Sequence, residues 1–154
     1  MAPGSVAVAD AMGVTDAGIF GDILCARIKQ RGVAGLVTDG AVRDMAGVLN
    51  TGLSVWCGGA AAPPSVASLT FVNWQEPIGC GGVSVYPDDV VVADDDGAVL
   101  IPAALVEEVA RVAPEQERME TWIMGEVLKG ATLPGLYPPN EDNLKRYKDW
   151  ASRR

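Results

Sequence analysis

Apolar residues follow two different spacings along the first part of the chain, and each spacing predicts one kind of element. Short apolar runs at 33–37 and 53–57 have the length of buried strands. A third run, 5–11, places Val6 and Val8 on one face and also predicts a strand. The intervals between these runs are long enough to hold helices.

Helical spacing occupies both intervals. Apolar residues recur every fourth position from Phe20 to Ile28, which predicts a helix over 19–31, and Gly32 suits its left-handed end. The same kind of spacing predicts a second helix over 41–50. Strands and helices that alternate in this order predict a parallel sheet with helical crossovers, and therefore an α/β fold.

The middle of the chain is richer in strand signals. Turn residues separate short runs of β-type residues, which predict further strands. These runs lie at 67–74, 82–87, 89–94 and 97–102. The sequence DDDG between the last two runs predicts a β-hairpin rather than a metal site.

The last third of the chain returns to helical spacing. A helix is predicted from Leu105, and Pro114 favours the first turn of a new helix that ends at Gly130. The charged tail that follows also carries aromatic residues, so we expect it to dock on the domain or on a neighbouring subunit. We therefore divide the chain into an α/β domain over 1–135 and a C-terminal tail over 136–154.

Composition narrows the classes of function. The chain has 154 residues, 49% of them hydrophobic, and a formal net charge of −8, which argues against nucleic acid or a membrane as its partner. Three cysteines without a CxxC pair, and no sign of a signal peptide, are typical of a cytoplasmic protein. Histidine is absent, so acid–base or metal chemistry must come from carboxylates, lysine, tyrosine or cysteine.

The stretch VTDGAVRDM, residues 37–45, admits two interpretations. Asp39, Arg43 and Asp44 form either a turn followed by a solvated helix start, or the rim of a site for an anion and a metal ion. The stretch follows a predicted parallel strand, and ligands of α/β sheets bind at that end of a strand. The loop after the preceding strand leads to Asp22, and neighbouring parallel strands would bring both loops to one edge of the sheet.

The spacing from Asp22 to Arg43-Asp44, within GD…RGVAGLVTDGAVRD, resembles the signature of the RraA-like and 4-hydroxy-4-methyl-2-oxoglutarate aldolase family. The resemblance continues through PIGCGGVSVYPDDVVVADDDGAVLIP and GLYPPNE, and it covers most of the chain. The family includes metal-dependent class II pyruvate aldolases, which also decarboxylate oxaloacetate, and regulators of ribonuclease E that lack the acidic catalytic residue. Because Asp22 is present, the resemblance indicates the catalytic branch.

The resemblance implies a role for each site residue. Asp44 would coordinate a divalent metal, Arg43 would bind the keto acid and stabilise the enolate, and Asp22 would hold a metal-bound water for proton transfer. The amides from Gly21 to Ile23 would receive the substrate carboxylate. The residues suit this chemistry, because an imine route needs a buried lysine and the lysines here lie in polar segments. Oxygen ligands favour Mg²⁺ or Mn²⁺ as the metal.

The same resemblance implies a swivelling β/α domain that assembles as a homotrimer or a hexamer. A further acidic residue would come from a neighbouring subunit; Glu117 and Glu120 are candidates, and both fit solvent-facing helix positions equally well. Family members are typically longer before the equivalent of PGSVAVAD, so we expect part of the sheet and of the substrate pocket to be missing or supplied differently.

The expected function is that of a divalent-metal-dependent lyase. It would cleave 4-hydroxy-2-oxo acids to pyruvate and would also decarboxylate oxaloacetate. The alternative is a non-catalytic regulator that binds a ribonuclease or another protein.

Overall fold

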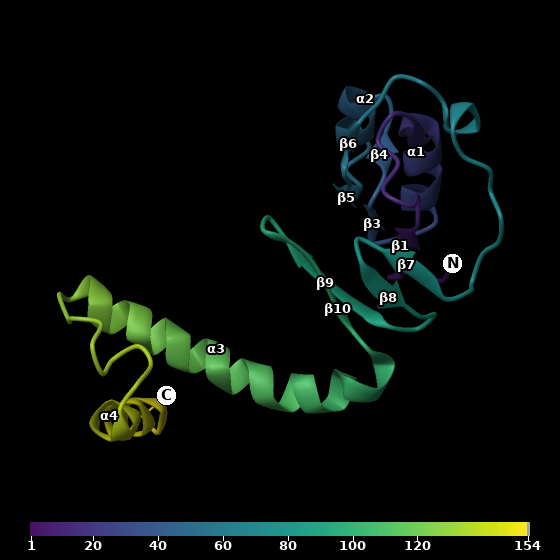
Figure 1. Ribbon diagram of the computed structural model, residues 1–154. Helices are drawn as coiled ribbons and strands as arrows, with labels where there is room; N and C mark the ends of the chain where they lie inside the picture. Colours follow the sequence, from purple (N-terminus) through teal and green to yellow (C-terminus); the bar gives the residue numbers. More distant parts are fainter. Residues whose placement is uncertain (154) are drawn as a thin grey trace. The chain divides into compact units, whose positions relative to one another are not determined.

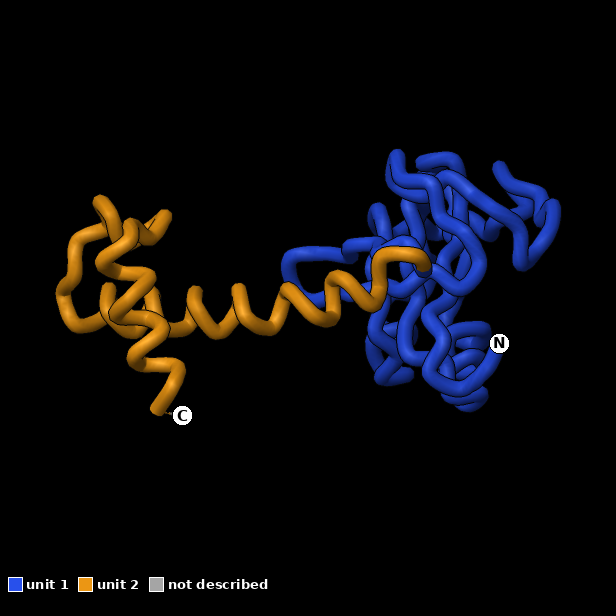
Figure 2. Tube along the Cα trace, turned by 90° about the horizontal axis from the view of Figure 1, so that it is seen from below, with its two compact units in different colours: residues 1–103 blue, residues 104–154 orange. Residues whose placement is uncertain are grey.

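The computed structural model describes residues 1–153 and contains helices together with parallel strands, which confirms the predicted α/β fold (Figure 1). The chain divides into two compact units, Met1–Ala103 and Ala104–Arg154, which Figure 2 colours separately. The expected domain boundary between residues 135 and 136 stays a prediction. Among the helices that the structure describes, none combines the length and the apolarity needed to cross a bilayer.

A three-stranded parallel sheet lies at the centre of the first unit. Its strands, in spatial order, are β1 (Val6–Ala9), β3 (Gly35–Thr38) and β5 (Ser54–Trp56). The connections between them contain α1 (Asp22–Gln30) and α2 (Met45–Asn50), which lie side by side in Figure 1. This arrangement confirms the predicted alternation of parallel strands and helices.

The core of the first unit forms around the central strand. The register places Leu36 of β3 beside Ala7 of β1 and Val55 of β5, and the Leu36 side chain is fully buried. The buried cluster consists of Cys25, Ile28, Val33, Leu36, Val42, Val48 and Leu53. Because its members come from the strands and from both helices, burial of their apolar surface holds the helices against the sheet.

A second parallel sheet, which the sequence did not predict, includes the two strands that lead into α1 and α2. Its strands, in spatial order, are β2 (Gly18–Phe20), β4 (Ala41–Val42) and β6 (Gly59–Ala60). The helices predicted over 19–31 and 41–50 are therefore wrong at their starts, because Phe20 and Val42 pair with each other as strand residues. The helices begin only at the residues given above, and their apolar faces are shorter than predicted.

The strand predicted over 67–74 is also wrong. A 3₁₀ helix, η1 (Ser65–Ala67), precedes an irregular segment in which Phe71, Val72 and Trp74 are between 70% and 90% exposed. Residues of β-type favour a strand when a neighbouring strand supplies hydrogen bonds and packing. Within residues 1–153 this segment has no such neighbour.

Two antiparallel hairpins complete the first unit. They are formed by β7 (Ile78–Cys80) with β8 (Val83–Val85), and by β9 (Val90–Asp94) with β10 (Gly97–Ile101). The second hairpin confirms the DDDG prediction, whereas β7 was not predicted. The indole N–H of Trp56 donates to the carbonyl oxygen of Asp94 at 2.7 Å, which ties this hairpin to β5.

The second unit is helical. A 3₁₀ turn, η2 (Ala103–Leu105), leads into α3 (Val106–Leu128), and a left-handed Gly130 follows this helix as predicted. Pro114 lies inside α3, so the new helix predicted to start there is wrong. A proline removes the hydrogen bond to the carbonyl oxygen four residues earlier, which here belongs to Ala110. Both residues are exposed, so water can hydrate that oxygen and the helix continues.

The tail forms α4 (Glu141–Ala151), which packs on the C-terminal half of α3. The residues buried in this unit are Trp122, Ile123, Leu136 and Tyr147. The rings of Trp122 and Tyr147 are 5.8 Å apart, and the Arg146 guanidinium lies 5.5 Å from the Trp122 ring centroid while it pairs with Glu126. The aromatic residues of the tail therefore build the core of the second unit together with α3.

Removal of the Leu136 side chain tests this core. Leu136 is 2% exposed, so we expect Leu136→Ala to lower the free energy of unfolding of this unit by about 2–4 kcal/mol. Leu133 lies in the same loop but is 54% exposed, and Leu133→Ala is the matched control with little expected effect. Hydrogen exchange of the α4 amides measures the loss, and equal protection in the two variants would contradict the packing.

Candidate functional site

Two short parallel strands bring the predicted site residues together. β2 and β4 pair with Gly18 opposite Ala41 and Phe20 opposite Val42. The backbone N–H of Arg43 donates to the carbonyl oxygen of Phe20 at 2.8 Å, so the segments that follow the two strands start side by side. A common sheet edge was expected at the ends of the strands predicted over 5–11 and 33–37. The structure forms this edge from β2 and β4 instead.

Arg43 and Asp44 form an ion pair at the start of α2. The Nε of Arg43 donates to Oδ2 of Asp44 at 2.9 Å, and the two side chains are 41% and 46% exposed. Asp44 has a left-handed backbone with φ 53° and ψ 41°, which aspartate adopts more readily than most residues. Its carbonyl oxygen accepts the first helical hydrogen bond from Val48. Both groups are exposed enough to be accessible to a ligand. An ion pair this exposed contributes little to stability.

Gly21 lies directly against this ion pair. A Cβ atom added at Gly21 would lie 3.1 Å from Oδ2 of Asp44 and 3.2 Å from Nε of Arg43. Such distances are tighter than most real Cβ contacts, so the missing side chain lets the end of β2 approach both charged groups closely. The backbone of the first loop therefore belongs to the same surface as the charged pair.

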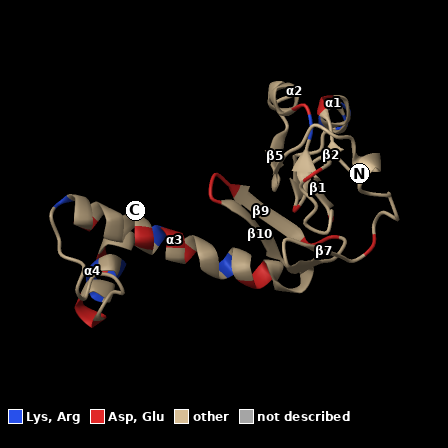
Figure 3. Cartoon of the chain, turned by 45° about the horizontal axis from the view of Figure 1, so that its top comes forward, with Lys and Arg blue, Asp and Glu red and all other residues tan. Residues whose placement is uncertain are grey.

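Asp22 is the first residue of α1, and its carboxylate lies between the two helices. Its Oδ1 accepts a hydrogen bond from the backbone N–H of Ile23 at 2.7 Å. Its Oδ2 faces Gly47 of α2, where an added Cβ would lie only 2.6 Å away. Acidic and basic residues thus meet where α1 and α2 begin (Figure 3). Because the Ile23 amide already binds Asp22, the proposed binding of a substrate carboxylate by the amides of this loop stays a prediction.

Asp39 takes a different place from Asp44, although both belong to the stretch 37–45. Its Oδ1 accepts from the backbone N–H of Ala11 at 2.8 Å. Its Oδ2 accepts from the N–H groups of Gly13 at 3.0 Å and of Gly81 at 3.5 Å. The carboxylate thus joins the loop after β1 to the turn of the first hairpin. Asp39 is therefore an anchor of the fold, and for Arg43 and Asp44 the site interpretation stays a prediction.

The thiol of Cys25 lies in the core behind Asp22. Burial raises the pKa of this thiol, and the negative charge of Asp22, followed by that of Cys57, raises it further. A cysteine reacts as its thiolate, so a raised pKa keeps Cys25 unreactive at neutral pH. The core therefore supplies packing at this position rather than a nucleophile.

The donors fit a metal that keeps most of its own water. Among the residues that the structure describes, no group of three or more histidine, cysteine, aspartate or glutamate side chains is placed to enclose a metal ion. Magnesium is commonly bound by one or two carboxylates and completed by water and substrate oxygens. Asp44 offers a half-exposed carboxylate, with that of Asp22 on the neighbouring helix, and this oxygen-only set suits Mg²⁺ or Mn²⁺.

The remaining candidates lie in the second unit. Glu117 is exposed on α3, and Glu120 accepts a hydrogen bond from the side chain of Gln116 at 3.3 Å. Their expected contribution to a neighbouring site stays a prediction.

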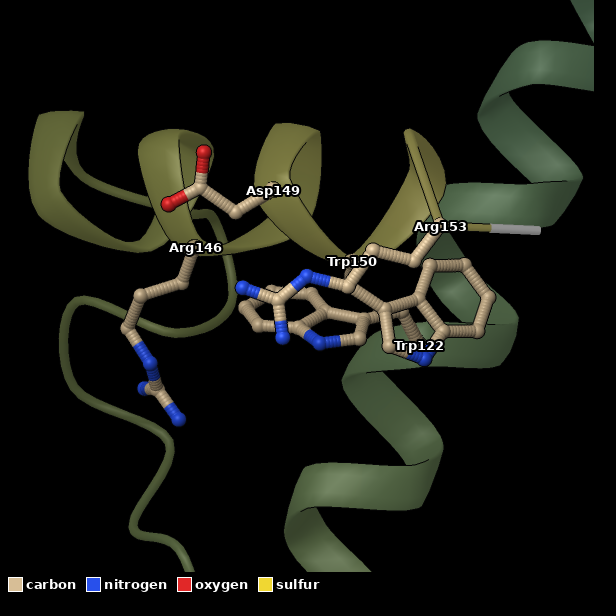
Figure 4. Close-up of a pocket in the computed structure, with 5 residues that line it drawn as sticks. All are labelled: Trp122, Arg146, Asp149, Trp150 and Arg153. Carbon is tan, nitrogen blue, oxygen red and sulfur yellow. The ribbon is translucent and has the colours of Figure 1, made fainter.

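Each unit also has a surface hollow. The hollow of the first unit, about 500 Å³, is lined by the ends of β3 and β5 and by Gly97 and Ala98 of the second hairpin. Asp39 lines it, whereas Asp22, Arg43 and Asp44 do not. The hollow of the second unit, about 430 Å³, lies where Trp122 of α3 meets side chains of α4 and Arg153 (Figure 4).

Comparison with known sequences finds one matching family and several relatives. The family described as RraA-like, Aldolase/RraA, matches residues 1–100 of the chain. A Halalkalibacterium halodurans protein, provisionally named a 4-hydroxy-4-methyl-2-oxoglutarate aldolase, is 36% identical over 75% of this chain and 54% of that protein. Protein DlpA of Legionella pneumophila is 31% identical over 84% of this chain and 21% of its own length. The chain thus spans about half of the first relative and much less of the second.

Solved structures agree with this result. An uncharacterized protein from Pseudomonas syringae pv. tomato matches with a TM-score of 0.85 and 28% identity, over 91% of this chain and 66% of that one. Streptomyces coelicolor RraAS2, described as an unusual member of the RNase ES inhibitor RraA protein family, matches with a TM-score of 0.77 and 37% identity. That match covers 80% of this chain and 63% of the Streptomyces chain. The predicted combination of parallel sheets, hairpins and C-terminal helices is therefore confirmed.

Asp39 and Asp44 should respond to substitution in different ways. Asp39→Ala leaves two or more backbone N–H groups without their acceptor, so we expect the free energy of unfolding to fall by about 1–3 kcal/mol. Asp44→Asn keeps a side chain that tolerates the left-handed backbone, and loss of an exposed ion pair should cost less than about 1 kcal/mol. Denaturant unfolding measures both, and the reverse order would contradict the assignment.

Proposed function

The chain belongs to the RraA-like family described as Aldolase/RraA, and from this premise we propose that it is a divalent-metal-dependent lyase. It would cleave 4-hydroxy-2-oxo acids, such as 4-hydroxy-4-methyl-2-oxoglutarate, to pyruvate and a second carbonyl compound. Oxaloacetate is included as a substrate, because its decarboxylation produces the same pyruvate enolate. The provisional name of the Halalkalibacterium relative supports this class of reaction.

One observation carries the proposal. Asp22, Arg43 and Asp44 come from two loops that the pairing of β2 with β4 sets side by side, and Gly21 lies against the charged pair. Two carboxylates and a guanidinium on one exposed surface suit a reaction in which negative charge develops on a keto acid. A mere turn and helix start would not need this gathering of charge.

Arg43 is the residue we assign to the developing enolate. Its Nε binds Asp44, and no partner of its terminal Nη groups is found within residues 1–153. A guanidinium donates in a planar fork that matches a carboxylate or an enolate with its adjacent carboxylate. The contact with Asp44 fixes the direction of this fork, so that the substrate meets a group that is already oriented.

Asp44 and Asp22 would serve in metal binding and in proton transfer, respectively. Asp44 would hold Mg²⁺ or Mn²⁺, and the bound ion would act as a Lewis acid toward the keto-acid oxygen. Asp22 would hold the water through which a proton is transferred, because its carboxylate is fixed at the edge of the same surface. All four lysines of the chain are exposed, so none is placed in the apolar environment that an imine-forming lysine requires.

A second function has an observation of its own. The Streptomyces neighbour, at 37% identity, is described as a member of a ribonuclease-inhibitor family. The alternative is therefore a non-catalytic regulator that binds a ribonuclease or another protein through its acidic surface. Inhibition of a ribonuclease by the purified chain, with no pyruvate formed under any metal condition, would favour this alternative.

Pyruvate release separates the two functions. We expect the chain to release pyruvate from 4-hydroxy-4-methyl-2-oxoglutarate with Mg²⁺ or Mn²⁺ and to stop when a chelator is added. Arg43→Ala removes the donors assigned to the enolate, so kcat should fall by about 100-fold or more. Arg27→Ala, at an exposed arginine near the end of α1, is the matched control. Activity that survives both the chelator and Arg43→Ala would contradict the mechanism.

We also propose that the chain assembles as a homotrimer or a hexamer. The exposed apolar side chains of Phe71, Val72 and Trp74 support this, because a monomer rarely exposes such a cluster without a binding role. Light scattering should therefore give the mass of a trimer or hexamer, and Phe71→Ser with Trp74→Ser should reduce it. A monomeric wild-type chain would overturn the assembly, and an unchanged mass of the double variant would exclude this segment from the interface.

A further inference from the structure

We propose that Gly47 is a positioning residue for Asp22, a role that neither its sequence context nor the comparisons assign. The inference rests on the proposed function, because it concerns how the chain holds the carboxylate that we assign to proton transfer. In this view the missing side chain at residue 47 creates the space that the Asp22 carboxylate occupies. Any larger residue at this position would displace that carboxylate from the edge of the site.

Gly47 lies close to the Cβ of Asp22 as well as to its carboxylate. An added Cβ would lie 2.6 Å from Oδ2, 2.8 Å from Cβ and 3.1 Å from Cγ of Asp22. Real Cβ atoms essentially never come within 3.0 Å of a neighbour. Rotation of the carboxylate could relieve the first contact but not the second, since the Cβ of Asp22 moves only with the backbone of α1.

The core packing prevents α1 and α2 from moving apart as whole helices to accommodate a larger residue at position 47. Cys25 and Ile28 of α1 and Val48 of α2 belong to one buried cluster, and Val48 directly follows Gly47. A shift of either helix would therefore open the core of the first unit. The displacement falls instead on the start of α1, where the backbone at Asp22 must move and take the carboxylate away from the edge of the site.

The position of Gly47 links Asp22 to the proposed metal ligand. Asp44 is the N-cap of α2, and Gly47 follows three residues later in the first turn. One helical turn therefore carries Asp44 at its start and receives the Asp22 carboxylate on its surface. A glycine needed only for close packing of helices would affect stability alone, whereas a positioning glycine also sets the turnover of the site.

A pair of glycine-to-alanine variants tests the proposal. Gly125 lies inside α3, and an added Cβ there meets nothing within 4 Å, so Gly125→Ala is the matched control. We expect Gly47→Ala to lower kcat by about tenfold or more, with KM for the keto acid and the affinity for Mn²⁺ nearly unchanged. The ¹³C signal of the Asp22 carboxyl should shift in Gly47→Ala and not in Gly125→Ala.

A double-mutant cycle keeps the test independent of catalysis. Asp22→Gly removes the three atoms nearest to the added methyl group, so most of the stability cost of Gly47→Ala should disappear in the Asp22→Gly background. An unshifted Asp22 signal, or a stability cost that persists in that background, would overturn the inference. A wild-type chain that releases no pyruvate would instead overturn the proposed function, and the expected effect on kcat with it. The ¹³C signal and the double-mutant cycle would still decide whether Gly47 positions Asp22.

Discussion

The arrangement of the first unit depends on the pairing of β2 with β4. These strands have only three and two residues, yet their parallel register and the hydrogen bond from Arg43 to Phe20 determine where two loops emerge. Both strands lead into helices whose inner faces pack in the core. The register of β2 and β4 is therefore fixed by the packing of these helices as well as by the backbone hydrogen bonds between the strands. A shift of this register would separate Asp22 from Arg43 and Asp44 without removing any of them.

The charged groups at this edge are held by contacts that leave their outer sides accessible. Arg43 is restrained by Asp44, and Asp22 by its neighbouring amide and by a glycine of the second helix. Exposed ion pairs add little to the free energy of folding. The fold is therefore stabilised mainly by the apolar cluster and by Asp39, and the groups assigned to chemistry can change without unfolding the chain. Such a separation of tasks suits a family whose members differ in whether they catalyse a reaction.

The sequence allowed the longer elements to be predicted and the shorter ones not. Strands β1, β3 and β5 are continuous apolar runs, which periodicity detects, whereas two- and three-residue strands such as β4 and β2 have no measurable period. Their apolar residues were taken for helix faces. Asp22, Arg43 and Asp44 could be selected from their spacing, because the resemblance covers them. Gly47 could not, since its importance arises from the contact between two helices, which no local pattern encodes.

The left-handed backbone of Asp44 limits which residues can replace it during evolution. Asparagine and glycine accept this conformation with least strain, and each is reached from an aspartate codon by one base change. A lineage can therefore lose the carboxylate while it retains the turn, the helix start and the core beneath. Descendants with and without this carboxylate would then share nearly identical backbones, so overall structural similarity would not distinguish them.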